Sequence, residues 1–379
     1  MKKVNIVIIV LIILQFSCTK DVETIPSTSD CNNKDYIRSH PQQEVFQMLL
    51  DDATRSGLVG ASLYVNQMDR GEFLGNSGFS SLETQKPITR CSKYRIASLT
   101  KTVLATAILL LESEGLLNLN TPIRDILSED ILMDIKRAEK ATVQQLLNHS
   151  SGIANYDDNS RFPAMILNEP GGRISLDEKL ELIRGQPAAP DEIIQQFGSL
   201  YSNSNYLLLQ LILEKVSGQT YEEFIYTNIL NKIGLTAMIF STQEPYPEDL
   251  VKGYVDFFDN NTIRDVSEWD AKRFDGEGSL IASVSEVFRF YDALFSGNIL
   301  DEESLKKMMS GNLGLLKLRD DGIEYIGHDG VAIGYSAEAW YSVEKRALVI
   351  LLANQGRISD DQPSIQKYEE LLLDIFKGL

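Results

Sequence analysis

Segments with the alternating or continuous apolar character of β-strands occur near both ends of the sequence, and helical segments fill the middle. This order constrains the fold strongly, because successive hairpins without strand–helix–strand alternation favour an antiparallel sheet. We therefore expect the late strands to join the early ones in one sheet. The strand-like segments are residues 58–66, 71–79, 323–330, 332–343 and 346–354.

The helical pattern predicts how the rest of the chain is organised. An amphipathic helix is expected at residues 42–56, and another at residues 363–377. Residues from about 120 to 275 are helical and loop-rich, and two more helical segments follow within 280–310. The expected class is α+β: an antiparallel sheet flanked by helices, with an all-α insertion lobe at about 120–275. The cleft between the lobe and the sheet is the expected place for a site.

A nucleophile and a base are suggested by Ser98 and Lys101, which open the apolar run of residues 100–117. Positions i and i+3 of a helix project from the same face. A hydroxyl becomes a good nucleophile when a nearby base takes its proton, and a lysine serves as that base if burial lowers its pKa. The simpler alternative is that Ser98 caps a helix and Lys101 is solvated, which the long apolar run disfavours because a buried charge is costly.

Two later motifs carry further candidate residues. Tyr201 and Asn203 precede an apolar helix, where they can shuttle a proton and hold a substrate amide, or simply pack and cap the helix. His328 and Gly330 lie between strand-like segments, where a backbone N–H can donate to an oxyanion, or the glycines can simply form a turn. His149 is interpreted as a structural or supporting residue.

The composition excludes several functional classes. The net charge of −18 argues against nucleic acid and against a polybasic grip on anionic lipid. The sequence has no Cys/His cluster at metal-ligand spacing and no glycine-rich nucleotide fingerprint. We therefore expect no metal and no cofactor. A metallohydrolase is disfavoured because the sequence lacks the ligands for its metal.

Taken in order, SLTK, YSN and HDG resemble the serine β-lactamase and penicillin-binding-protein superfamily. The most similar branch contains class C β-lactamases, D-alanyl-D-alanine carboxypeptidases and related esterases. The resemblance covers about residues 42–379 and implies a β-lactamase/transpeptidase-like fold. Further segments that look familial are QQLLNHSSGI, LYSNSNYLLLQLILEKVSGQTYEEFI and GEGSLIASVSEVFRFYDALFSG.

The resemblance implies a role for each motif residue. Ser98 would be the acylated nucleophile, Lys101 its base and Tyr201 the proton relay. Asn203 would hold the substrate amide, and the backbone N–H groups of Ser98 and Val331 would form the oxyanion hole beside Gly330. His328 stands where many relatives have a lysine, and a histidine is mostly neutral at pH 7.

The function expected from this resemblance is an exported serine hydrolase acting on amide or ester bonds, of the D-Ala-D-Ala carboxypeptidase or esterase type. Its substrate would be a small molecule or a peptide, such as a cell-wall peptide or an ester. A weak class C-like β-lactamase is one alternative. The other is a non-catalytic surface lipoprotein that retains the fold for binding. The oligomeric state is not predicted.

The first residues resemble a bacterial lipoprotein signal. Lys2 and Lys3 precede a short apolar run, and a small residue stands before Cys18. We expect a signal peptide at 1–18, lipidation of Cys18, and a flexible tether at 19–41 that precedes the hydrolase domain at 42–379. The expected location is the bacterial cell envelope, periplasmic or on the outer surface, anchored to the membrane through the lipid; a plain secretory signal and an uncleaved anchor are the alternatives. Cys31 and Cys91 can pair or remain free thiols.

Overall fold

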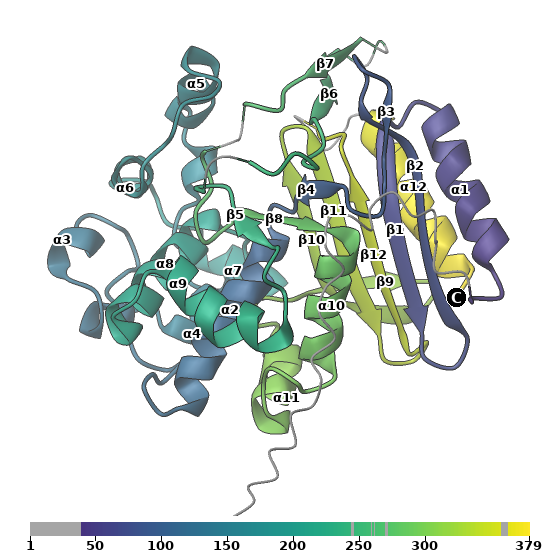
Figure 1. Ribbon diagram of the computed structural model, residues 1–379. Helices are drawn as coiled ribbons and strands as arrows, with labels where there is room; N and C mark the ends of the chain where they lie inside the picture. The colour runs from purple at the N-terminus through teal and green to yellow at the C-terminus, as the bar shows by residue number, and fades with distance from the viewer. Residues whose placement is uncertain (1–38, 244–245, 259, 261, 270–271, 358–362) are drawn as a thin grey trace, which may run out of the picture.

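The computed structural model describes residues 39–243, 246–258, 260, 262–269, 272–357 and 363–379. Seven antiparallel strands form its central sheet (Figure 1). They are β1 (Gly60–Gln67), β2 (Gly71–Ser81), β3 (Lys86–Pro87), β9 (Leu316–Asp320), β10 (Ile323–Ala332), β11 (Tyr335–Ser342) and β12 (Ala347–Ala353). The order across the sheet is β3-β2-β1-β12-β11-β10-β9.

The first and last strands of this sheet pair at its centre. β1 runs antiparallel to β12, with Ala61 opposite Ala353 and Gln67 opposite Ala347. Every residue of β12 is buried, as its unbroken apolar sequence predicts for a strand covered on both faces. The expectation that the late strands join the early ones is confirmed.

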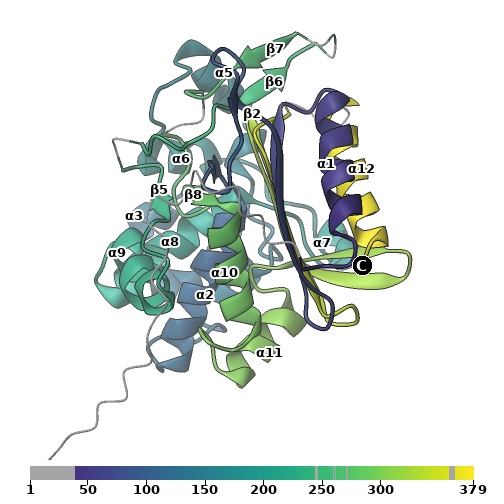
Figure 2. The ribbon, with the colours of Figure 1, turned by 45° about the vertical axis from the view of Figure 1, so that its right-hand side comes forward.

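Helices cover both faces of the sheet (Figures 1 and 2). On one face lie α1 (Gln43–Arg55) and α12 (Pro363–Lys377), and on the other lie α2 (Leu99–Ser113) and α10 (Val284–Phe295). α1 starts and stops within one residue of the predicted range, and it buries Phe46 and Leu50. The α+β class with a helix-flanked antiparallel sheet is therefore confirmed.

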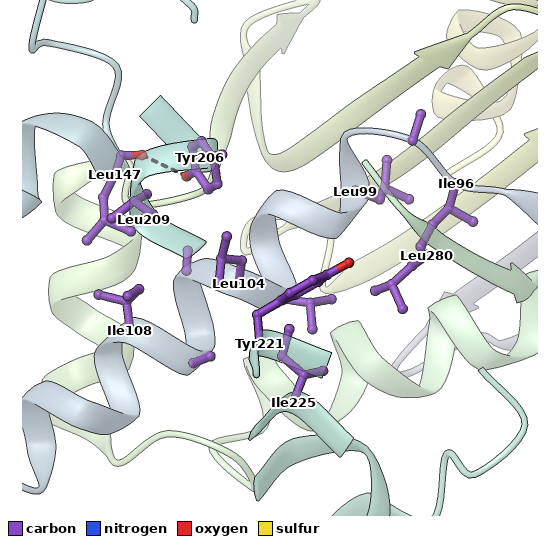
Figure 3. Packing of buried hydrophobic residues seen from close by; sticks show 14 of the residues in the cluster. Ile96, Leu99, Leu104, Ile108, Leu147, Tyr206, Leu209, Tyr221, Ile225 and Leu280 are labelled. Carbon is purple, nitrogen blue, oxygen red and sulfur yellow. Dashed lines mark hydrogen bonds between the residues drawn. The ribbon is translucent and has the colours of Figure 1, made fainter. Parts of the chain in front are cut away.

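α2 is the core helix of the structure. Its residues from Leu99 to Leu109 are all buried, because apolar residues occur on every side of the helix. Figure 3 shows Leu104 and Ile108 of α2 packed among side chains of α8 (Asn203–Ser217) and α9 (Tyr221–Ile225). The helix that begins just after Ser98 is thus held rigidly by the packing around it.

The range 120–275 is not purely helical, which corrects the expected all-α lobe. It contains three short strands: β5 (Ile239–Phe240), β6 (Tyr254–Asp256) and β7 (Ile263–Asp265). β6 pairs with β7, and β5 joins β8 (Leu280–Ser283) and β4 (Lys93–Arg95) in a small sheet. Strands of two or three residues are too short to show an alternating pattern.

The remaining helices lie mostly in this lobe, with the last one following α10. They are α3 (Glu129–Leu132), α4 (Val143–Leu147), α5 (Arg161–Asn168), α6 (Leu176–Ile183), α7 (Asp191–Phe197) and α11 (Glu302–Gly311). Short 3-10 turns occur at Ile123–Asp125, Tyr156–Asp158 and Asn231–Ile233, and a π-helical turn at Tyr226–Leu230.

The predicted signal peptide, Cys18, Cys31 and most of the tether fall outside the described residues. Cys91 is disulfide-bonded. Within the described ranges, no helix combines the length and hydrophobicity that crossing a bilayer requires.

Candidate active site

Ser98 is the N-cap residue of α2, but its side chain does not cap the helix. Its hydroxyl makes no capping hydrogen bond to the helix backbone. The preceding residue, Ala97, has φ of +46°, in the left-handed region that non-glycine residues rarely adopt. Strain of this kind is concentrated at functional sites. The backbone turns sharply here, and Ser98 is the half-buried residue between buried neighbours.

Lys101 approaches the same hydroxyl from within the protein. Its Nζ donates to Ser98 Oγ at 2.9 Å and to the carbonyl oxygen of Glu277 at 2.6 Å. The side chain is fully buried. Desolvation lowers the pKa of Lys101 to about 8, although the negative charge of Glu277 partly offsets this effect. An amine with this pKa has an accessible neutral form close to physiological pH, so it can serve as a base.

Tyr201 completes the contacts of the Ser98 hydroxyl. Its phenol donates to Ser98 Oγ at 2.9 Å, and its ring lies 5.2 Å from Lys101 Nζ. Burial of the hydroxyl raises the pKa of Tyr201 well above its ordinary value, so the phenol keeps its proton at neutral pH. The side chain is positioned to donate that proton to an atom close to Ser98.

His149 supports the loop that carries Tyr201. Its ring lies 4.3 Å from the Tyr201 ring, and its Nδ1 accepts the backbone N–H of Ser202. The backbone N–H of Leu200 donates to its carbonyl oxygen at 2.9 Å. These contacts fix the backbone on both sides of Tyr201.

Asn203 is the first residue of α8 and is oriented by a carboxylate. Its Nδ2 donates to Asp157 Oδ2, which directs its carbonyl oxygen Oδ1 the other way. That oxygen is buried and has no hydrogen-bond partner among the described residues. Burial raises the pKa of Asp157 to about 6. The arrangement leaves an acceptor available for an N–H group of a ligand.

A buried ionic network fixes the loop that receives Lys101. The Glu277 carboxylate accepts from Lys179 Nζ at 2.6 Å and from the Tyr156 hydroxyl at 2.8 Å. Lys179 also contacts Asp275 Oδ2 at 2.9 Å, and neither Lys179 nor Glu277 is exposed. Burial opposes ionisation of Glu277, but Lys179 outweighs it and holds the pKa of Glu277 below its ordinary value.

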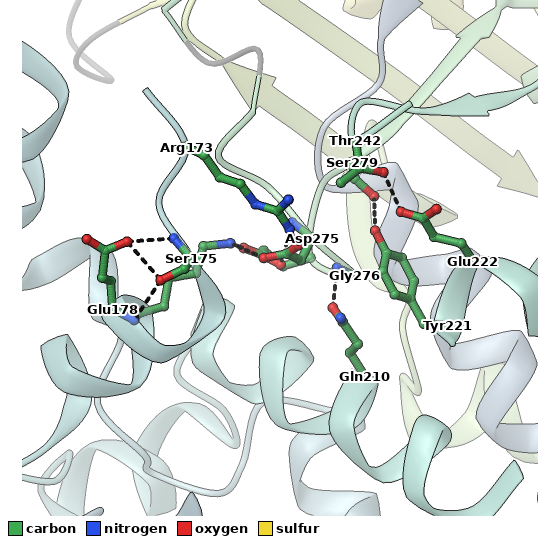
Figure 4. Close-up of polar contacts among 12 residues, drawn as sticks. Arg173, Ser175, Glu178, Gln210, Tyr221, Glu222, Thr242, Asp275, Gly276 and Ser279 are labelled. Carbon is green, nitrogen blue, oxygen red and sulfur yellow. Dashed lines mark hydrogen bonds and ion pairs between the residues drawn. The ribbon is translucent and has the colours of Figure 1, made fainter. Parts of the chain in front are cut away.

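Neutral contacts hold the same loop from the other side (Figure 4). Gln210 accepts the backbone N–H of Gly276 at 2.8 Å, and the hydroxyls of Tyr221 and Ser279 lie 3.1 Å apart. Arg173 points toward Asp275 from the lobe. The carbonyl that binds Lys101 therefore belongs to a loop held by charged and neutral contacts together.

β10 brings Gly330 against Ser98. β9 pairs with β10 only as far as Gly327, so residues 328–332 extend beyond the end of β9. A Cβ on Gly330 would lie 2.4 Å from the carbonyl oxygen of Ile96 and 3.2 Å from the backbone nitrogen of Ser98. Only glycine permits this approach. Val331 follows in the strand, paired with Ser336 of β11.

His328 is buried and uncharged. Its Nδ1 donates to the carbonyl oxygen of Asp329, so Nε2 carries the lone pair. Burial lowers the pKa of His328 to about 4. Nε2 has no hydrogen-bond partner among the described residues, and the ring lies 6.1 Å from that of Tyr201.

The structure thus brings Ser98, Lys101 and Tyr201 into direct contact and places Gly330 against Ser98, with His328 close to Tyr201. Asn203 lies beside Asp157, whose charge reaches Lys101. Sequence reasoning missed Ala97, Glu277 and Lys179. A signal for the last existed, because Lys179 occurs on the apolar face of a helical segment, three residues after Leu176 and four before Ile183. In the part of the chain that the structure describes, no cluster of His, Cys, Asp or Glu is arranged to hold a metal.

Known proteins resemble the chain in sequence and in fold. It is 24% identical to "Penicillin-binding protein 4*" of Bacillus subtilis over 78% of this chain and 68% of that protein. It is 28% identical to "Putative penicillin-binding protein PbpX" of the same organism, over 79% and 71%.

Among solved structures, a D-amino acid amidase of Ochrobactrum anthropi SV3 superposes with a TM-score of 0.77 at 24% identity, over 88% of this chain and 98% of that one. A D-stereospecific amidohydrolase of Streptomyces sp. gives 0.72 at 26% identity, over 86% and 98%. The Beta-lactamase family model matches residues 45–372, which is most of the sequence. The chain therefore belongs to the beta-lactamase family, within the superfamily of serine hydrolases that includes penicillin-binding proteins and amidases.

Proposed function

We propose that this protein hydrolyses amide or ester bonds through an acyl-enzyme formed at Ser98. The observation that carries the proposal is the double contact of Ser98 Oγ, with Lys101 Nζ and the Tyr201 hydroxyl each at 2.9 Å. A serine that only caps a helix needs neither contact. A buried amine with a lowered pKa, next to a hydroxyl on a rigid helix, is the arrangement that activates a weak nucleophile.

In the acylation step, neutral Lys101 takes the proton of Ser98 as Oγ bonds to the substrate carbonyl carbon. The bond from that carbon to the leaving nitrogen or oxygen then breaks. Tyr201 donates its proton to the departing atom and regains one from protonated Lys101. Water hydrolyses the acyl-enzyme through the same groups in reverse, which releases the acid and restores Ser98.

Two further contacts fit this scheme. The backbone N–H groups of Ser98 and Val331 would receive the oxyanion, and each such donor contributes about 3 kcal/mol in comparable sites. Gly330 supports this role because it allows the strand to approach the backbone nitrogen of Ser98. The unpartnered Oδ1 of Asn203 would accept an N–H group of the substrate acyl part.

The proposed substrates are small amides, esters or peptides. The name of the similar D-stereospecific amidohydrolase supports compounds with a D-configured residue. A weak β-lactamase activity and a non-catalytic binding role are the competing proposals. The unbroken Ser98, Lys101 and Tyr201 contacts favour catalysis over the second.

The deciding experiment is labelling with a fluorophosphonate probe, followed by mass-spectrometric mapping and a hydrolysis assay. We expect the label on Ser98, and no labelling or hydrolysis of a nitrophenyl ester by Ser98→Ala. The matched control Ser310→Ala, at an exposed serine of α11, should keep both. Full ester hydrolysis by Ser98→Ala would overturn the proposal. Faster turnover of a chromogenic cephalosporin than of the ester would favour the β-lactamase.

Export and lipid anchoring at Cys18 remain our proposal for the location. Its support is the charged, apolar and small-residue–Cys order of the first residues. Metabolic labelling with a radioactive fatty acid should mark the full chain, and Cys18→Ala should lose the label. Retention of the label by that variant would contradict the proposal.

A further inference from the structure

A cavity of about 720 Å³ opens beside Tyr201, and we call it the Tyr201 cavity. Its lining includes His149 and Tyr201 from the lobe, Asp329 of β10, Glu338 and Trp340 of β11, and Leu372 of α12. Ser98 does not line the cavity, but Tyr201, whose hydroxyl lies 2.9 Å from Ser98 Oγ, connects the two.

The position of Tyr201 indicates which half of a substrate enters the cavity. A group that protonates a leaving atom must lie within hydrogen-bond reach of it. Under the proposed function that group is Tyr201, which is also part of the cavity lining. Tyr201 also lines a second cavity of about 330 Å³, together with Asn155, which accepts the backbone N–H of Asn203. Because Asn203 would hold the acyl half on the side of this second cavity, the leaving group departs toward the Tyr201 cavity.

The charge of the cavity is negative. Asp329, Glu338 and Glu369 line it, with Lys317 as the lysine among its described lining residues. Lys317 and Glu369 each have an ion-pair partner: Lys317 contacts Glu324 at 3.4 Å, and Glu369 contacts Arg357 at 3.4 Å. Asp329 and Glu338 are the other two carboxylates of the lining, and they lie on the neighbouring strands β10 and β11.

Asp329 and Glu338 lie directly opposite each other in the β10–β11 pairing. Like charges in that position destabilise a sheet. Burial, followed by the charge of Asp329, raises the pKa of Glu338 well above its ordinary value, so Glu338 loses its charge more readily than an exposed glutamate. Asp329, with a side chain 41% exposed, is then the carboxylate that a leaving group meets.

His328, whose Nδ1 lies 3.6 Å from Asp329 Oδ1, adds a second indication. Many proteins of the superfamily that the chain resembles have a lysine at this position, and its positive charge suits a substrate carboxylate. Here the side chain is neutral and offers the lone pair of Nε2, which is buried and has no partner among the described residues. A lone pair accepts hydrogen bonds and repels a carboxylate, so His328 suits an N–H or O–H group of the leaving half.

We propose that Asp329, together with His328, determines the charge selectivity of the leaving-group side. The site accepts substrates that release an alcohol or an amine without a carboxylate, such as esters, primary amides and C-terminally amidated peptides. It excludes peptides that release a free amino acid from their carboxyl end. This inference rests on the proposed function, and it selects the esterase and amidase alternatives over the carboxypeptidase.

The test compares two peptides with the same scissile bond, acyl-D-Ala-D-Ala and acyl-D-Ala-D-alaninamide. For the wild-type protein we expect kcat/KM to be at least about tenfold higher for the amide, the size of one charge repulsion across a partly solvated site. Asp329→Asn should reduce this ratio to about a third or less, mainly by lowering KM for the carboxylate peptide. Asp329→Ser is the second variant, in case the first does not fold.

The control variant is Asp321→Asn, which removes an exposed charge from the β9–β10 turn outside the cavity and should leave the ratio unchanged. A wild-type ratio of one or less would overturn the inference, as would an unchanged ratio in a folded Asp329 variant. Hydrolysis of a nitrophenyl ester separates the two proposals. If the ester is cleaved and Ser98 is labelled, an equal rate on the two peptides refutes only the selectivity; without ester cleavage or labelling, the proposed function fails.

Discussion

Replacement of Lys179 by methionine tests whether the buried ionic network supports the base. Lys179 Nζ contacts Glu277 Oε1 at 2.6 Å and Asp275 Oδ2 at 2.9 Å, and the lysine side chain is fully buried. Lys179→Met leaves two buried carboxylates that have lost this cation. Removing one partner of a buried ion pair typically costs about 3–5 kcal/mol, so we expect the free energy of unfolding at neutral pH to fall by that amount.

The pH dependence of this loss has a definite sign. In the wild-type protein the pKa of Glu277 is lowered in the folded state, so its contribution is present above the unfolded pKa and is lost on acidification. Without Lys179, burial dominates and raises the folded pKa above the unfolded value. The variant is then stabilised as the pH falls toward the unfolded pKa of Glu277, and the difference between the two proteins should shrink.

The same variant should raise the pKa of Lys101, the proposed base. The charge of Lys179 contributes to lowering the pKa of Lys101, so its removal should shift the midpoint of the rate of Ser98 labelling to higher pH. Urea denaturation at neutral pH and near pH 5 measures the first effect, and stopped-flow labelling measures the second. Lys136→Met is the matched control, because its ion pair with Asp134 is exposed and should contribute at most about 1 kcal/mol. A Lys179→Met loss within that same range would refute the reasoning.

The other predictions concern the groups around Ser98. The rate of Ser98 labelling by a fluorophosphonate should rise with pH and level off above about pH 8, as Lys101 loses its proton, and a profile that is flat from pH 6 to 9 would contradict this base. Tyr201→Phe should slow turnover of an amide about 10²–10⁴-fold with an unchanged circular dichroism spectrum, because the proton donor is lost while the ring remains. Gly330→Ala should abolish labelling or unfold the protein, since its Cβ would lie 2.4 Å from the carbonyl oxygen of Ile96; a fully active variant would show that the strand does not approach Ser98 in this way.

The sequence predicted the parts of the fold that have strong periodicity. β1, β2, β10, β11 and β12 all follow from their alternating or continuous apolar segments. β9 was not expected, because Leu316–Asp320 is short and mixes leucines with charged residues at its exposed sheet edge. The strands of the lobe could not be predicted, because each pairs with its neighbour over only two or three residues. Segments this short show no alternating pattern in the sequence.

For the candidate site, motif spacing identified the residues now seen around Ser98, but not what holds them. Glu277 and Lys179 are 98 positions apart, and nothing in either local segment indicates the other. The left-handed backbone of Ala97 was equally hidden, because alanine usually adopts helical or extended conformations. The charge of the Tyr201 cavity could not be predicted from the sequence, because it depends on the pairing of β10 with β11, which places Glu338 opposite Asp329.

The central pairing of β1 with β12 links the order of synthesis to the completion of the site. A growing chain makes β1, α2 and the lobe long before it makes the strand on which β1 must close, and pairings so distant in sequence form slowly. Ser98, Lys101 and Tyr201 are therefore all synthesised before β10 can supply Gly330 and His328. The unfinished polypeptide carries Ser98 without the strand beside it, so the proposed activity would arise only at the last stage of folding.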